Sequence, residues 1–153
     1  SEADLDPAPL RAALAAAAPR RPNPPTLLHG DFWPGNVLWH NGRLAAIIDW
    51  EDAARGDPLI DLARSRSEIA WILGPAALDA FTRHYLALAA IHTADLPYWD
   101  LCAALRFLRL ANGDLAGLAA YFAAYGRADI TAATIRRHVH AFIAAARARL
   151  PAG

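Results

Sequence analysis

The stretch LLHGDFWPGNVLWHNGRLAAIIDWED, residues 27–52, decides the fold because it joins a hairpin signal to a dense group of polar side chains. Asn41-Gly42 separates two short apolar runs, VLWH (37–40) and RLAAIID (43–49). Asn-Gly is a strong signal for a two-residue hairpin turn, since both residues accept the positive φ that such a turn needs. The sequence therefore predicts a β-hairpin with strands at about 37–40 and 43–49.

The turn also predicts the register of the hairpin. A two-residue loop pairs the last residue of the first strand with the first residue of the second, which places Asn36 opposite Ile47. Asp49 follows two residues later and should share a face with Asn36, since side chains alternate along a strand. Diagonal neighbours of this kind lie about 7–8 Å apart. The open end of the hairpin is therefore expected to hold an amide and a carboxylate close together.

Asp31 lies on the loop that enters the same end of the hairpin, five residues before Asn36. Carboxylate and amide oxygens are the ligands that Mg²⁺ takes from proteins. Asp31, Asn36 and Asp49 are therefore interpreted as a Mg²⁺-phosphate site with a carboxylate beside it. Turn capping within a Gly/Pro-rich loop would explain Asp31 or Asn36 singly, but it does not explain the spacing of all three.

The remainder of the chain has the apolar periodicity of helices. The predicted fold class is α+β and mainly α-helical, with the hairpin packed on a helical bundle, and residues 1–153 form one domain. Proline and glycine mark several of the predicted helix ends, as at Pro19 and Gly74-Pro75. The predicted helices cover about 7–18, 59–73, 78–88, 96–111, 115–125 and 130–150.

Composition excludes several classes of function. The 15 basic and 15 acidic residues give a formal net charge of zero, whereas a nucleic-acid-binding protein usually carries a basic excess. No apolar run reaches the roughly 18 residues needed to cross a bilayer. The single cysteine, Cys102, has no partner for an internal disulfide. We expect no nucleic-acid or membrane partner, and a cytoplasmic location.

Two linked motifs carry a resemblance to a known family. His29-Gly30-Asp31 followed by Asn36 resembles the catalytic loop of protein-kinase-like phosphotransferases. Glycine in the second place is similar to the aminoglycoside phosphotransferases and their choline kinase-like relatives. The segment IIDWEDAARGDPLIDLA (47–63) resembles the next segment of that family, with Asp49 at the position of the metal-binding aspartate.

The resemblance implies roles for the three polar residues. Asp31 would be the catalytic residue that accepts or orients the proton of the acceptor hydroxyl. Asn36 and Asp49 would hold Mg²⁺ on the phosphates of ATP or GTP. Phosphoryl transfer through a loose transition state depends mainly on positioning, so a modest base is enough.

Further polar residues of the two motifs are assigned supporting roles by the same resemblance. His29, Asp57 and Asp61 would brace the catalytic loop; an aspartate near a helix start can accept backbone N–H bonds. Glu51 has the side-chain parity of Asp49. A place beside the metal and a solvated loop carboxylate are both open interpretations for it.

The implied activity is phosphorylation of a hydroxyl on a small molecule, with an aminoglycoside-, choline- or homoserine-like acceptor. The chain departs from the family because all its basic residues are arginine, and the family's nucleotide-binding lobe carries a lysine. Residues 1–153 are therefore expected to be the C-terminal lobe alone, without the N-terminal lobe and inactive by itself. We expect the surface left by that lobe to favour self-association.

Other interpretations remain. A non-catalytic binding or scaffold domain could keep the kinase-like fold. A metal-dependent hydrolase is less favoured, because the His-rich ligand sets common in such sites are missing. Carboxylates and aromatic side chains of the later helices are candidates for an acceptor pocket, although solvation and core packing also explain them: Asp79, Asp95, Asp100, Asp114, Trp71, Tyr98 and Trp99.

Overall fold

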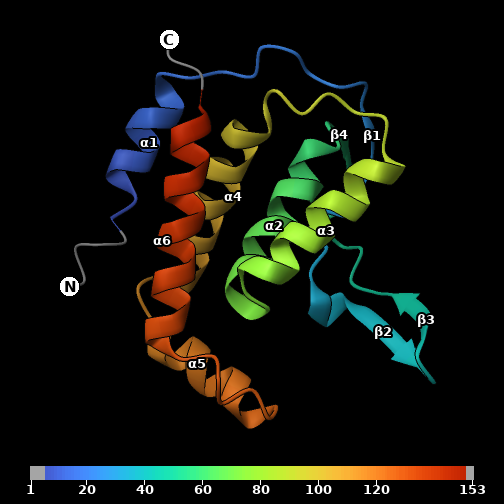
Figure 1. Cartoon of the computed structure of the whole chain (residues 1–153), viewed down its shortest axis with the longest axis vertical. Coiled ribbons are helices and arrows are strands. Elements are labelled where there is room, and N and C mark those ends of the chain that lie inside the picture. The colour runs from blue at the N-terminus through green and yellow to red at the C-terminus, as the bar shows by residue number, and fades with distance from the viewer. Residues whose placement is uncertain (1–5, 151–153) are drawn as a thin grey trace.

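The computed structural model describes residues 6–150 and confirms an α+β fold that is mainly helical (Figure 1). Each predicted helix is present, with ends that differ from the prediction by at most three residues. The longest shifts are at the end of α1, which stops at Ala15, and at the start of α3, where Pro75 in the first turn begins the helix. The helices are α1 (Ala8–Ala15), α2 (Leu59–Ile72), α3 (Pro75–Leu88), α4 (Leu96–Ala111), α5 (Leu115–Ala124) and α6 (Ala132–Arg149).

Four short strands form two separate antiparallel pairs in the described part of the chain. The predicted hairpin consists of β2 (Val37–His40) and β3 (Arg43–Ile47). A second pair, β1 (Thr26–Leu28) with β4 (Ala54–Gly56), lies in segments for which the sequence analysis predicted no strand. This pair closes the base of the loop region between residues 29 and 53, so it sets the position of the motif residues.

The hairpin register differs by one residue from the prediction. His40 pairs with Arg43 as expected, and both turn residues have positive φ. An irregularity in the ladder then shifts the pairing, so that Val37 and not Asn36 lies opposite Ile47. An extra residue of this kind is a β-bulge, which changes the face of every side chain beyond it. The predicted pairing of Asn36 with Ile47 is therefore wrong.

The second strand also ends earlier than predicted. β3 stops at Ile47, and the next backbone N–H, that of Ile48, donates to the carbonyl oxygen of Asn36 at 3.0 Å. Asp49 has a φ of +66°, outside the extended region of a strand. Alternation along a strand therefore cannot be the reason why Asp49 lies near Asn36.

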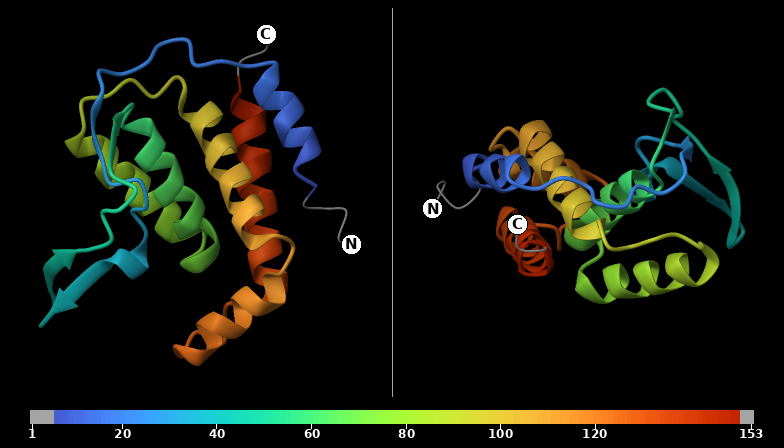
Figure 2. Two further views of the ribbon diagram at one scale, coloured as in Figure 1. Left: turned by 180° about the vertical axis from the view of Figure 1, so that it is seen from behind. Right: turned by 90° about the horizontal axis from the view of Figure 1, so that it is seen from above.

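The core of the molecule lies around α4, which packs between α2 and α6 (Figures 1 and 2). Leu101 and Ala104 of α4 have no exposed surface. The β2–β3 hairpin extends away from these helices (Figure 1), and its apolar side chains Leu38, Trp39 and Leu44 are exposed. None of the helices described within residues 6–150 is long and apolar enough to cross a membrane.

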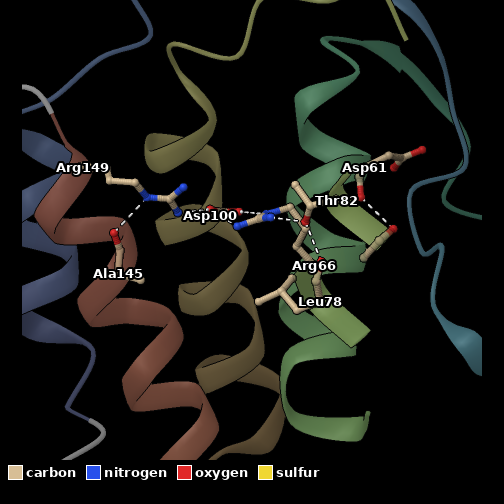
Figure 3. A network of polar contacts seen from close by, with 8 residues as sticks. Asp61, Arg66, Leu78, Thr82, Asp100, Ala145 and Arg149 are labelled. Atoms are coloured by element: carbon tan, nitrogen blue, oxygen red, sulfur yellow. Dashed lines mark hydrogen bonds and ion pairs between the residues drawn. The ribbon is translucent and has the colours of Figure 1, made fainter. Parts of the chain in front are cut away.

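A buried ion-pair network joins the helices beneath the surface (Figure 3). Arg66 of α2 donates Nε–H and Nη2–H to the two carboxylate oxygens of Asp100 of α4, at 3.0 and 3.1 Å. Arg149 of α6 approaches the same carboxylate at 3.4 Å, and Thr82 of α3 accepts from Arg66. Burial raises the pKa of Asp100, and the two arginines oppose this effect. Helices α2, α4 and α6 thus meet at one carboxylate, and α3 joins the network through Arg66.

Candidate functional site

The loop His29-Gly30-Asp31 follows β1 directly and is held by a carboxylate of α2. The backbone N–H groups of His29 and Gly30 donate to the two carboxylate oxygens of Asp61, at 2.6 and 3.0 Å. Gly30 has a φ of +88°, and a Cβ there would lie 2.2 Å from the carbonyl oxygen of Asp52. Only glycine fits this position. Asp61 therefore lies where the resemblance implied, directly under the loop.

Two further side chains of α2 complete this support. Arg64 donates to the carbonyl oxygen of Gly30, and the hydroxyl of Ser65 donates to that of Phe32 at 2.8 Å. The sequence analysis did not identify either residue. Together with Asp61 they lie at helical spacing in a helix otherwise rich in apolar residues, which is the signal that would have revealed them.

His29 connects the loop to the segment before Asp49. Its Nδ1 accepts the backbone N–H of Asp31 at 3.2 Å, so its Nε2 carries the proton and donates to the carbonyl oxygen of Ile48 at 2.9 Å. The N–H of Ile48 is bonded to Asn36. The backbone N–H and C=O groups of Ile48 are therefore both hydrogen-bonded, and Asp49 is the next residue. These bonds, and not the predicted strand register, place Asp49 beside the loop.

The carboxylate of Asp31 is paired and partly exposed. Its Oδ1 accepts from Nη2 of Arg106 at 3.0 Å, and about 30% of each side chain is exposed. The Asn36 amide Nδ2 donates to the backbone carbonyl of Asp31 at 2.9 Å and approaches its Oδ2 at 3.4 Å. Asp31 and Asn36 are therefore brought together as predicted, and Arg106 is an additional partner that the motif did not contain.

The two predicted magnesium ligands offer free oxygen atoms. The Asn36 side chain directs its Nδ2 to Asp31, and its Oδ1 accepts no hydrogen bond within residues 6–150. Asp49 is exposed, and its carboxylate has no hydrogen bond or ion pair there. No group of three His, Cys, Asp or Glu in this part of the chain could hold a metal ion. One amide oxygen and one carboxylate are the kind of protein donors that Mg²⁺ takes, together with phosphates and water.

Asp57 and Glu51 lie in different surroundings. Asp57 is buried and accepts from the backbone N–H groups of Asn23, at 2.8 Å, and Leu59, at 2.9 Å. It joins the segment before β1 to the start of α2, and so supports the flank of the catalytic loop. Glu51 is exposed and has no hydrogen bond or ion pair within residues 6–150, and its neighbour Asp52 lies 3.9 Å from Arg106. The parity argument for Glu51 fails, because β3 ends at Ile47.

A cavity of about 520 Å³ opens beside Asp31. Of the acceptor candidates from the sequence, Trp71 and Asp114 line it, and Asp114 also caps α5 through the N–H of Gly117 at 2.8 Å. Asp95 and Asp100 are instead buried in other hydrogen bonds. The walls come from the catalytic loop and from α2, α4 and α5, and they include Trp33, Glu68, Trp71, Arg106, Phe107, Leu118, Tyr121 and Phe122.

Glu68 is a titratable group of this cavity that the sequence analysis missed. Burial raises its pKa to about 7; the nearby positive charge of Arg106 opposes the shift and the negative charge of Asp31 adds to it. A carboxyl with such a pKa changes charge close to neutral pH. Arg106 stands among apolar residues of α4, which is a sequence signal for this pair, whereas Glu68 follows the polar run Arg64–Ser67 of α2 and has no such signal.

The shifted pKa of Glu68 predicts a pH dependence of stability. Between pH 4.5 and about 7 the folded state keeps a proton that the unfolded state releases, so stability should fall as the pH rises through this window. In Glu68→Gln that fall should be smaller, by on the order of 1–3 kcal/mol. Urea unfolding across the pH range measures it, with Glu51→Gln as the exposed control. An equal pH dependence in both variants would contradict the assignment.

Comparison with known proteins agrees with this geometry. The sequence profile of the phosphotransferase enzyme family matches residues 1–105. The chain therefore belongs to the phosphotransferase enzyme family, and the resemblance to aminoglycoside phosphotransferases is confirmed. The match includes the catalytic loop, the hairpin and the start of α4.

Curated relatives match over shorter stretches. Hygromycin-B 4-O-kinase of Escherichia coli is 37% identical over 59 residues, which are 39% of this chain and 16% of that protein. Acyl-CoA dehydrogenase family member 11 of Gallus gallus is 37% identical over 60 residues, 38% of this chain and 8% of its own length. Acyl-CoA dehydrogenase family member 10 of Mus musculus is 29% identical over 104 residues, 56% of this chain and 10% of its own length. The chain thus spans a small part of these relatives, and no solved structure matches it significantly.

Proposed function

We propose that the protein containing this chain is a small-molecule kinase, which transfers a phosphoryl group from ATP or GTP to a hydroxyl of its acceptor. The observation that carries the proposal is Asp31. Its carboxylate lies at a cavity of about 520 Å³ and its backbone is bonded to the Asn36 amide. Membership of the phosphotransferase family supports the reaction class.

In this proposal Asp31 is the catalytic base. A carboxylate at the mouth of the cavity accepts a hydrogen bond from an acceptor hydroxyl and orients its oxygen towards the phosphoryl group. Arg106 is bonded to Oδ1, and Oδ2, which the Asn36 amide approaches only at 3.4 Å, would make this contact. Asp61, Arg64 and Ser65 hold the loop and so fix the position of the base.

Asn36 and Asp49 would hold Mg²⁺ on the nucleotide phosphates. Bound there, the ion would neutralise charge that develops on the transferred group. The free Oδ1 of Asn36 and the unpaired carboxylate of Asp49 are the donors. His29 would keep the two ligands in place through Ile48, whose peptide groups it and Asn36 bind.

The acceptor would bind in the cavity lined by Trp33, Trp71 and Tyr121. Such walls favour an alcohol with an apolar or cationic body, since aromatic faces bind both. An aminoglycoside-, choline- or homoserine-like compound is the proposed class. The nucleotide would be covered by a lobe outside residues 1–153, so this chain alone should be nearly inactive.

Two further parts of the proposal concern location and assembly. A cytoplasmic location is supported by the single Cys102, whose thiol pKa is raised by burial and which is therefore a poor nucleophile at neutral pH. Self-association through the hairpin is supported by the exposed side chains of Trp39 and Leu44, at 66% and 54%.

Nucleotide titration by calorimetry tests the metal site. With Mg²⁺ present, ATP should bind to the chain, and Asp49→Ala should weaken this binding tenfold or more, because a charged ligand contributes about 1.5–3 kcal/mol. Glu51→Ala is the matched control and should bind like the native chain. Equal affinity of both variants would contradict the role of Asp49. No magnesium-dependent binding in any of them would favour the scaffold interpretation.

A further inference from the structure

A second cavity, of about 640 Å³, lies between α3 and α6. It shares no lining residue with the cavity beside Asp31. Its lining includes Arg66 and Arg149, the two arginines of the network in Figure 3, which bridges the gap between α3 and α6. Nothing in the proposed phosphotransferase mechanism uses this cavity.

Positive charge exceeds negative charge in this cavity. Arg66, Arg83 and Arg149 line it, whereas the nearby carboxylates are Asp79 on the wall and Asp100 beneath. Arg66 is held by Asp100 and Thr82. Arg149 donates its Nε–H to the carbonyl oxygen of Ala145 at 3.1 Å and approaches Asp100 through Nη2 at 3.4 Å, so its Nη1 is left for a ligand. Arg83 is exposed and makes no hydrogen bond or ion pair within residues 6–150. Two guanidinium groups are therefore available to a ligand.

His138 of α6 adds a ring nitrogen that makes no hydrogen bond in the described part of the chain. Its Nδ1 is buried and has no hydrogen-bond partner there, although a buried polar atom normally has one. The ring lies at the start of α3, where a Cβ on Gly74 would be 3.9 Å from Cε1 of His138. A ligand with an acceptor oxygen would satisfy this atom.

The first turn of α3 faces the same cavity through Pro75, Leu78 and Asp79. No side chain caps this helix, and its first turn holds no acidic residue. The backbone N–H groups of a helix start, with the helix dipole behind them, favour an anion. Like the arginines, the start of α3 therefore favours a negatively charged ligand.

We propose that the cavity between α3 and α6 binds a phosphate group, carried by inorganic phosphate or by a small phosphomonoester. Arg83 and Arg149 are the cations that bind it, and His138 donates or accepts at a third oxygen. Planar guanidinium groups bind phosphate oxygens in pairs, which suits a doubly charged oxyanion. Asp79 on the wall opposes the ligand and lowers its affinity.

Titration of the native chain with inorganic phosphate tests the proposal, at constant ionic strength and without magnesium. Calorimetry and amide chemical shifts should show saturable binding, with shifts in α3 and α6. Arg83→Gln and Arg149→Gln should each weaken it at least about tenfold, since each removes a charge-assisted hydrogen bond to the phosphate. Asp79→Asn should tighten it. The exposed Arg147→Gln on α6 is the matched control and should not change it.

Three results would overturn the site. One is a response to phosphate that does not saturate and that chloride reproduces. Another is that Arg147→Gln weakens phosphate binding as much as Arg83→Gln does, which would mean that phosphate responds to the overall charge of α3 and α6 and not to a specific site. A third is that the shifts map to residues 29–36 and not to α3 and α6. Because Arg83 has no hydrogen-bond or ion-pair partner in the described part of the chain, Arg83→Gln should fold normally, and its phosphate affinity tests the site directly. Titration with glycerol phosphate separates the two sources: tighter binding than that of inorganic phosphate indicates a phosphomonoester.

Discussion

Replacement of Asp100 by alanine should lower the free energy of unfolding by about 3–5 kcal/mol, the largest stability effect that we expect in this molecule. Asp100 is fully buried, and Arg66, only 6% exposed, is paired with it. Without the carboxylate, the guanidinium group of Arg66 would remain buried beside Arg149 with no countercharge. The loss should therefore come mainly from an unpaired buried charge and not from the missing contact itself.

Urea unfolding at pH 7 measures the effect. Arg149→Gln removes the exposed partner of the same carboxylate and should change stability by less than about 1 kcal/mol. The double variant Arg66→Met with Asp100→Leu should recover most of the loss, because it removes both charges and fills the space. If Asp100→Ala and Arg149→Gln destabilise equally, the network is not the buried ion pair described here.

Asp31→Asn in the whole protein should lower kcat by about 10²–10⁴-fold if Asp31 is the catalytic base. Asparagine keeps the shape of the side chain and the backbone bonds of the loop, but it cannot take a proton. Nucleotide affinity should be almost unchanged, since the proposed metal ligands Asn36 and Asp49 are intact. Steady-state and single-turnover kinetics with an acceptor alcohol that the native protein phosphorylates measure the loss.

Asp52→Asn is the matched control for this experiment. Asp52 also faces Arg106, at 3.9 Å, but it is more exposed than Asp31, at 58% against 30%. Its replacement changes the charge near Arg106 without removing the proposed base, so kcat should fall by less than about tenfold. A similar loss in both variants would mean that the arginine's surroundings, and not proton transfer at Asp31, limit the reaction.

The helices were predictable because each signal is local. Apolar spacing and the Gly74-Pro75 break lie within one or two turns of the residues that they organise. The β1–β4 pair was not predictable, because its strands are three residues long and pair across more than twenty residues of chain. Strands of this length show too little alternation to be recognised.

The site was predictable only in part, for the same reason. The spacing of Asp31 and Asn36 brought them together as expected. Asp49 is positioned by the hydrogen bonds of Ile48 and not by the strand register that we predicted. A β-bulge displaces that register, and nothing in the two alanines at 45 and 46 shows where the bulge falls. Arg106 lies 75 residues from Asp31, so only the packing of α4 against α2 reveals their contact.

The support of the catalytic loop by α2 has a consequence for motion. His29 and Gly30 have no strand partner for their amides, and their protection depends on Asp61 of the helix. In terms of local unfolding, the loop and α2 should then open as one cooperative unit. The order of the loop at Asp31 therefore depends on the packing of α2. A substitution under α2, far from any substrate, would therefore release the loop as effectively as a change within the motif itself.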